Sequence, residues 1–280
     1  MEHETVQSIT LPVVEACLTS SFNALEDHIS SQALSDVKLI MQGHSMTPDM
    51  KERIMRAIEG ACVTLAMVQT DAISVATTGD CRVVLGREVG QSWQALPLSV
   101  DQNAMNGNEV ERLKMAHPGE DNIVLNGRVL GSLMPFRTFG DVDFKWDAKY
   151  LEGIVPVWPN YKTPPYITAA PVVTHHEITA GDRFLVIASD GLWERISNED
   201  VVNIVANTLK EETDLHGSFS LLKYFGKKGG AKCCPPNAAT QLLWHALGGA
   251  DEEVMKLLEV PPGYSRMVRD DITIIVVFFN

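Results

Sequence analysis

The sequence predicts an α+β protein, a β-sandwich flanked by helices. Short β-branched runs that alternate with polar residues cluster in residues 61–85 and 172–189, whereas helical periodicity lies before, between and after these runs. The chain has 280 residues, of which 45% are hydrophobic and 21% are charged, a composition typical of globular proteins. This length fits one large domain, and we find no internal repeat.

Two helices precede the first strand. Apolar residues recur at helical spacing over residues 12–30 and predict an amphipathic helix there. A second helix begins after the capping residue Thr47, with Pro48 in its first turn, and stops at Gly60. We therefore assign residues 1–60 to a helical N-terminal segment and residues 61–280 to the main domain.

The following residues read as strands and tight turns. Runs at 61–68, 72–76 and 82–85, separated by polar turns, predict an antiparallel meander. A short helix is predicted for residues 108–115. The pair Asn126-Gly127 favours a type I′ turn and hence a hairpin over residues 124–129. A second hairpin is predicted for residues 172–176 and 184–189, around Gly181-Asp182.

The last third of the chain mixes helices with a terminal strand. Ser197, with Asp200 three residues later, predicts a helix that runs to residue 209. Residues from about 211 to 236 lack periodicity and are read as a surface insertion, followed by a helix over 237–247. The terminal strand, residues 272–279, is apolar on both faces and is therefore expected to be buried.

Charge and cysteine content restrict the classes of function. The net charge of −13, with no block of Lys or Arg, argues against a general nucleic-acid binder and favours protein partners. The five cysteines show no zinc-type spacing, which indicates a reducing compartment. No apolar run reaches the length of a membrane span. No Lys or Arg precedes Lys38, so no transit peptide is visible.

Aspartates at strand ends and turns are the candidate functional residues. Any one of them taken alone is commonly a turn former. Two of them, however, lie in contexts that a turn does not require, the run from Arg137 to Asp141 and the run from Ser189 to Trp193. Carboxylates gathered at one place form a hard-metal site for Mg or Mn. The candidates are Asp80, Asp101, Asp141, Asp190, Asp270 and Asp271.

Five motifs occur in an order that resembles the PPM-type, metal-dependent Ser/Thr protein phosphatases. They are residues 78–82, 98–101, 137–141, 188–193 and 269–273. Further stretches resemble one subgroup of that family, the pyruvate dehydrogenase phosphatases, at residues 133–137, 144–146, 159–166 and 266–280. The resemblance is dense from about residue 76 onward and thin before Gly60.

The resemblance implies a fold, a site and a reaction. The fold is a sandwich of α/β/β/α layers. Asp190 and Asp270 would bind a binuclear Mg or Mn centre, and Asp101 would bind a third, weaker metal. The metals would hold the phosphate and activate the attacking water, so no catalytic residue beyond the metal site is required. The residues expected to support the site are Asp80, Asp141, Arg137, Gly191 and Asp271. The implied substrate is a phosphoprotein, the pyruvate dehydrogenase complex, and the implied location is the mitochondrial matrix.

The chain also departs from the family pattern. The phosphate-gripping Arg, the Glu-Asp pair and the Asp-Gly-His-Gly motif near the family's N-terminus are not visible, and the nearest match, residues 42–45, begins with Gln42. Gln102 stands where His is usual. The resemblance therefore describes an N-terminally truncated member. Two alternatives to an active phosphatase stay open: a catalytically inactive isoform or pseudophosphatase that acts as a binding module, and an unrelated carboxylate-metal hydrolase.

Overall fold

The computed structural model describes residues 10–217, 237–249 and 270–279, together with residues 256, 259–261 and 264. The chain divides into two compact units. The first comprises Met1–Cys81 and Ser99–Glu177, and the second comprises Arg82–Leu98 and Ile178–Asn280. Both units combine helices with an antiparallel sheet, which confirms the α+β class. The domain boundary placed after residue 60 stays a prediction.

The first unit is built on a three-stranded antiparallel sheet of order β1-β2-β7. Its strands are β1 (Val63–Val68), β2 (Ala72–Thr78) and β7 (Val172–Glu177). All seven residues of β2 are buried, as expected for the central strand. Val63 of β1 pairs with Thr78 of β2. On the other side of β2, Ser74 pairs with His175 of β7, so this sheet joins strands about one hundred residues apart in sequence.

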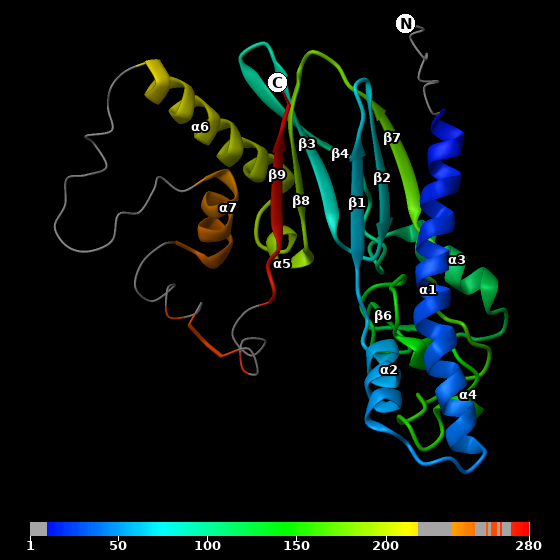
Figure 1. Cartoon of the computed structure of the whole chain (residues 1–280). Helices are drawn as coiled ribbons and strands as arrows, with labels where there is room; N and C mark the ends of the chain where they lie inside the picture. Colours follow the sequence, from blue (N-terminus) through cyan, green and yellow to red (C-terminus); the bar gives the residue numbers. More distant parts are fainter. Residues whose placement is uncertain are drawn as a thin grey trace, which may run out of the picture. The chain divides into compact units, whose positions relative to one another are not determined.

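Two helices form a hairpin, and the first of them packs against this sheet (Figure 1). Helix α1 (Leu11–Met41) runs eleven residues beyond the predicted end at residue 30, because Ala33 and Val37 extend its buried stripe and no Gly follows before Gly43. Helix α2 (Pro48–Ile58) begins as predicted, with the Met50 amide donating to Thr47 Oγ1 at 3.3 Å.

The rest of the first unit consists of short elements around an aromatic core. They are α3 (Gly107–Ala116), β5 (Val124–Leu125), β6 (Arg128–Val129), a 3-10 turn η1 (Val142–Phe144) and α4 (Ala148–Leu151). The predicted Asn-Gly hairpin is confirmed: Asn126 and Gly127 both have positive φ, 53° and 74°, as a type I′ turn requires. The core contains Leu113, Ile123, Phe136 and Tyr166.

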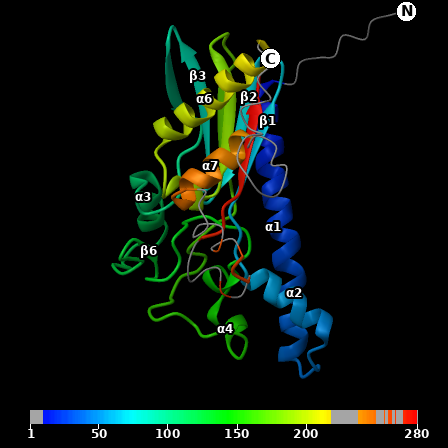
Figure 2. The same cartoon turned by 90° about the vertical axis from the view of Figure 1, so that its left-hand side faces the viewer.

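The second unit is built on a four-stranded antiparallel sheet of order β4-β3-β8-β9. Its strands are β3 (Arg82–Val89), β4 (Ser92–Pro97), β8 (Asp182–Ala188) and β9 (Ile274–Phe278). A short helix α5 (Asp190–Trp193) follows β8. Helices α6 (Asn198–Gly217) and α7 (Ala238–Leu247) pack against the sheet (Figure 2). The shared core contains Val186, Leu192, Val201, Val205 and Leu242.

The predicted meander of residues 61–85 is wrong at its second turn. Strand β2 pairs with β1 and β7, whereas β3 pairs with β4 and β8. The backbone of Gly79, at φ 106°, bonds in both directions to Gln102, which occupies the groups that a β2–β3 hairpin would use. Strand β4 was missed, and it forms the hairpin with β3 instead.

The predicted hairpin of residues 172–176 and 184–189 is also wrong, because β7 and β8 belong to different sheets. The turn between them closes on itself, with the Thr179 amide donating to Asp182 Oδ2 at 2.8 Å, and it docks on β3, whose Glu88 amide donates to the Gly181 carbonyl at 2.7 Å. A polar turn between two strands therefore does not identify the pairing partner.

Two expectations about the last third of the chain need correction. Strand β9 is an edge strand of its sheet, and Ile275 is 51% exposed, so its two faces are not both buried. The residues assigned to a surface insertion begin within α6, which continues to Gly217, because the polar residues there, such as Glu211 and Glu212, lack an apolar period but favour helix. Residues 218–236 of that assignment lie outside the described residues.

The α1–α2 hairpin generates a stability prediction. Ile54 is 2% exposed and packs against the cluster that contains Val37, Val142 and Leu151, so Ile54→Ala should lower the free energy of unfolding by about 2 to 4 kcal/mol through lost burial and a residual cavity. Urea denaturation measures this loss. Met55→Ala is the matched control, because Met55 is the next residue of the same helix but is 45% exposed, and its change should stay below about 0.5 kcal/mol.

Candidate carboxylate site

The ends of β8 and β9 bring two aspartate-bearing segments together in the second unit. The regular β8–β9 register ends with Ala188 opposite Ile274, and hydrogen bonds join the residues just beyond it. The Ser189 amide donates to the Thr273 carbonyl at 3.1 Å, and the Thr273 amide donates to Ser189 Oγ at 3.0 Å. Ser189 Oγ in turn donates to the Asp271 carbonyl at 3.0 Å. Residues 189–191 and 270–273 therefore lie side by side.

Asp190 and Asp270 have the same local geometry on these two segments. Asp190 Oδ1 accepts from the Gly191 amide at 2.9 Å, and Asp270 Oδ1 accepts from the Asp271 amide at 2.8 Å. Asp190 is half-buried, whereas Asp270 and Asp271 are exposed. The structure thus brings together four of the eight predicted site residues: Asp190, Gly191, Asp270 and Asp271.

Gly191 is required by close approach rather than by its backbone angles. A Cβ atom at this position would lie 2.6 Å from the Asp271 carbonyl oxygen and 3.0 Å from a side-chain carbon of Ile272. A carbon and a carbonyl oxygen cannot approach so closely, so a larger residue at position 191 must push the two segments apart. The glycine that follows the aspartate in the sequence motif therefore has a packing role.

Asp80 and Asp101 belong to the first unit, where Gln102 links the backbone around them. Gln102 is fully buried, and its side chain accepts from the Gly79 amide at 2.7 Å and donates to the Thr77 carbonyl at 2.8 Å. Its own amide donates to the Gly79 carbonyl at 3.0 Å. Gln102, which sequence analysis treated only as a departure from the family pattern, is thus a brace between the Asp80 turn and the segment that carries Asp101.

Arg137 joins Glu109 of α3 to the backbone at Ala170. Its guanidinium donates to both carboxylate oxygens of Glu109, at 3.0 and 2.5 Å, and to the Ala170 carbonyl at 2.7 Å. Burial alone would raise the pKa of Glu109, but the guanidiniums of Arg137 and Arg112 hold that pKa below its usual value. Sequence analysis missed Glu109, because a Glu near the start of a helix is ordinary.

Asp141 lies in a buried charge cluster of the first unit. Lys145 Nζ donates to Glu26 at 2.7 Å and to the Thr138 carbonyl at 2.8 Å, and the Gly140 amide donates to Glu26 at 3.0 Å. Burial, together with the nearby Asp143 carboxylate, raises the pKa of Asp141 to about 6. These neighbours make Asp141 part of a buried charge cluster, and its supporting role at the site stays a prediction.

The Cys62 thiol, which lies near Asp80, is not set up as a nucleophile. Burial raises the pKa of Cys62, and the neighbouring Asp80 raises it further. A thiol must lose its proton to attack, so this residue is inert near neutral pH.

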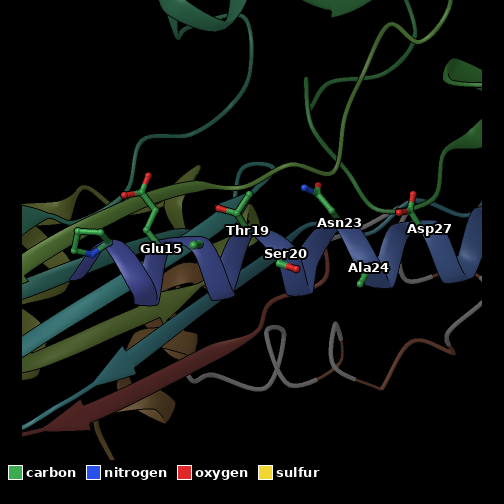
Figure 3. A pocket seen from close by; sticks show the side chains of 8 residues that line it. Glu15, Thr19, Ser20, Asn23, Ala24 and Asp27 are labelled. Atoms are coloured by element: carbon green, nitrogen blue, oxygen red, sulfur yellow. The ribbon is translucent and has the colours of Figure 1, made fainter. Parts of the chain in front are cut away.

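A shallow hollow follows one stripe of α1 (Figure 3). It is lined by small and polar side chains from successive turns of that helix, and none of the predicted site residues contributes to it. The residues labelled there are Glu15, Thr19, Ser20, Asn23, Ala24 and Asp27.

A sequence model described as Protein phosphatase 2C matches residues 7–232. The chain belongs to the protein phosphatase 2C family. This family is the PPM type that the five motifs resemble, so the alternative of an unrelated carboxylate-metal hydrolase is excluded. The match extends into α1 and α2, the part of the chain where sequence analysis found the resemblance thin.

Among curated proteins, the chain is similar in sequence to members of the predicted subgroup. It is 37% identical over 299 residues to human mitochondrial [pyruvate dehydrogenase [acetyl-transferring]]-phosphatase 2 and 38% identical over 314 residues to human phosphatase 1 of the same name. These alignments cover 95% and 99% of this chain but only 55% and 56% of the relatives. A Schizosaccharomyces pombe protein phosphatase 2C homologue is 39% identical over 81% of the chain. The chain thus spans about half the length of these relatives.

A solved structure shows the same fold. The serine-threonine phosphatase 2C of Toxoplasma gondii matches 98% of this chain and 72% of its own length, with a TM-score of 0.52 and 18% sequence identity. In the part of the chain that the structure describes, no helix combines the length and apolarity needed to cross a bilayer.

The side chains of the described residues can be tested for their fit to the divalent metals of the family. Across the described ranges, no three His, Cys, Asp or Glu side chains converge on one position that could hold a metal ion. The pair Asp190 and Asp270 offers carboxylate oxygens, the donors that Mg prefers, and Mg is commonly held by one or two carboxylates together with water and substrate phosphate. The donor atoms of this pair are therefore of the type that a hard divalent cation binds.

The close approach at Gly191 generates a prediction. Gly191→Ala should lower the free energy of unfolding by about 1 to 3 kcal/mol, because the new Cβ must displace the backbone at Asp271. Thermal or urea unfolding measures this loss. Gly107→Ala is the matched control: no atom lies within 4 Å of the Cβ position at this helical glycine, so the change should be neutral or slightly stabilising. Equal losses in both variants would contradict the packing role.

The Asp141 cluster generates a prediction about pH. Burial holds the pKa of Asp141 at about 6 in the folded chain, above the ordinary value of 3.8, so the native state binds the extra proton and its stability falls as pH rises from about 4 to 6. Asp141→Asn removes this loss and tolerates the positive φ of 46°. The variant should be more stable than wild type by about 2 kcal/mol at pH 7.5, with the difference vanishing below pH 4.

Urea unfolding across this pH range measures the difference, and Asp147→Asn, at an exposed carboxylate of the same unit, controls for the general loss of one negative charge. A variant less stable than wild type at pH 7.5 would show that the ionised Asp141 stabilises the fold.

Proposed function

We propose that this chain is a Mg- or Mn-dependent protein serine/threonine phosphatase. One observation carries the proposal: Ser189 and Thr273 join the two segments that bear Asp190 and Asp270, in a chain that belongs to the protein phosphatase 2C family. Carboxylates that a sheet holds side by side suit a shared cation site, because otherwise their mutual repulsion would cost stability.

The side chains divide into cation ligands and braces. Asp190 and Asp270 would hold the principal metals, and Asp101 would contribute to a third, weaker site. Divalent metal bound there would supply charge neutralisation at the phosphate and an activated water. Arg137 holds Glu109 and is not a phosphate ligand, while the Gln102 bonds fix the turn that carries Asp80.

We propose phosphoserine on the pyruvate dehydrogenase complex as the substrate and the mitochondrial matrix as the location. Support comes from the relatives named as mitochondrial pyruvate dehydrogenase phosphatases at 37% and 38% identity over nearly the whole chain. The subgroup stretches at residues 133–137, 144–146 and 159–166 give the same indication.

A second candidate function is a binding module without turnover. It is favoured by the sequence, in which the family's phosphate-gripping Arg and its Asp-Gly-His-Gly motif are not visible. Such a chain would bind the substrate complex and protect its phosphoserine.

The two functions differ in one assay, Mn-dependent hydrolysis of a phosphoserine peptide by this chain. The phosphatase hypothesis predicts metal-dependent release of phosphate, and loss of a direct ligand in Asp190→Asn should reduce the rate at least about 100-fold. Asp71→Asn, at an exposed turn aspartate, is the control and should retain the wild-type rate. Absence of turnover with intact binding to the phosphoprotein would favour the binding module.

A further inference from the structure

The Ser189 hydroxyl lies at the point where the β8–β9 ladder gives way to the aspartate-bearing segments. The regular pairing ends at Ala188 and Ile274. At the next pair, the Thr273 amide is met by the Ser189 hydroxyl at 3.0 Å rather than by a carbonyl, and the same hydroxyl donates to the Asp271 carbonyl at 3.0 Å. One side chain thus bonds to two backbone groups of the opposite segment, the amide of Thr273 and the carbonyl of Asp271.

These bonds act on the residues that carry the carboxylates. Ser189 directly precedes Asp190, and Asp271 directly follows Asp270. Each carboxylate is also fixed to its own segment, through the Gly191 and Asp271 amides. The separation of the two carboxylates therefore depends on how the segments are joined. Beyond the last regular pair of the two strands, the Ser189 hydroxyl makes two hydrogen bonds to the opposite segment, one with the Thr273 amide and one with the Asp271 carbonyl.

We propose that Ser189 is a positioning residue that sets the separation of the Asp190 and Asp270 carboxylates and thereby the affinity for a divalent cation. This inference rests on the proposed function, because it concerns the same carboxylate pair. An alanine at position 189 keeps the backbone bond from its amide to the Thr273 carbonyl but leaves the Thr273 amide and the Asp271 carbonyl without this hydroxyl partner. The fold survives, while the carboxylates lose their fixed spacing.

The test compares three variants of the whole chain, with Mn²⁺ as the probe. Binding is measured by electron paramagnetic resonance of free Mn²⁺ during titration. Ser189→Ala should weaken Mn²⁺ binding by about 10- to 100-fold, the usual effect of removing a partner that orients a ligand. Ser189→Thr keeps the hydroxyl and should restore binding to within about threefold of wild type.

Ser197→Ala is the matched control. The Ser197 hydroxyl also makes two hydrogen bonds in the same unit, accepting from the Asp200 amide at 3.1 Å and donating to the Asp200 carboxylate at 2.8 Å. It caps α6 and touches neither aspartate segment, so its loss should lower the melting temperature without weakening Mn²⁺ binding. Equal Mn²⁺ affinity in Ser189→Ala and wild type would overturn the positioning role.

Hydrogen exchange separates this inference from the proposed function. Ser189→Ala should speed exchange of the Thr273 amide by roughly tenfold, whether or not metal is present. Wild-type chain that binds no Mn²⁺ would overturn the proposed metal centre and with it the positioning role. Faster Thr273 exchange in the variant would show in that case that the junction itself is described correctly, whereas unchanged exchange would overturn the junction as well.

Discussion

The antiparallel pairing of β8 with β9 is the constraint on which the carboxylate site depends. These strands join parts of the chain more than eighty residues apart, and their ladder ends with Ala188 opposite Ile274. A shift of one residue would turn every side chain to the other face of the sheet and separate Ser189 from Thr273. The buried residues Phe184 and Val186 on β8 fix this register against the helices α6 and α7. Core packing therefore determines which aspartate-bearing segments lie side by side.

In the first unit, several motif residues stabilise the fold through buried hydrogen bonds and ion pairs. Arg137 and Glu109, Lys145 and Glu26, and the Gln102 amide each satisfy groups that would be costly to bury alone. Removing one member of such a pair leaves a buried partner without its hydrogen bonds, so these residues stabilise the fold rather than contact a substrate. A motif shared by a whole family can accordingly contain ligands and braces in adjacent positions. Asp190 belongs to the first kind in our proposal, and Arg137 belongs to the second.

Local signals in the sequence identified the elements better than their partners. The Asn126-Gly127 turn and the Thr47 cap were predictable, because each depends on a few neighbouring residues. The pairing of β7 with β2 and of β8 with β3 was not, because strand order depends on contacts between segments about one hundred residues apart. The aspartates were found through their motif contexts. Glu109, Gln102 and the junction role of Ser189 were missed, because their importance lies in long-range hydrogen bonds that leave no local pattern.

We propose that the segments joined by Ser189 and Thr273 form the cation site of this chain. Paramagnetic broadening of backbone amide resonances by substoichiometric Mn²⁺ tests it directly, because broadening falls steeply with distance from the bound ion. Our account predicts that the amides of Gly191 and Asp271 broaden first, while that of Asp200 in α6 broadens later. Broadening that begins at the acidic residues of α1, such as Glu15 and Asp27, or that is uniform along the chain, would contradict the claim.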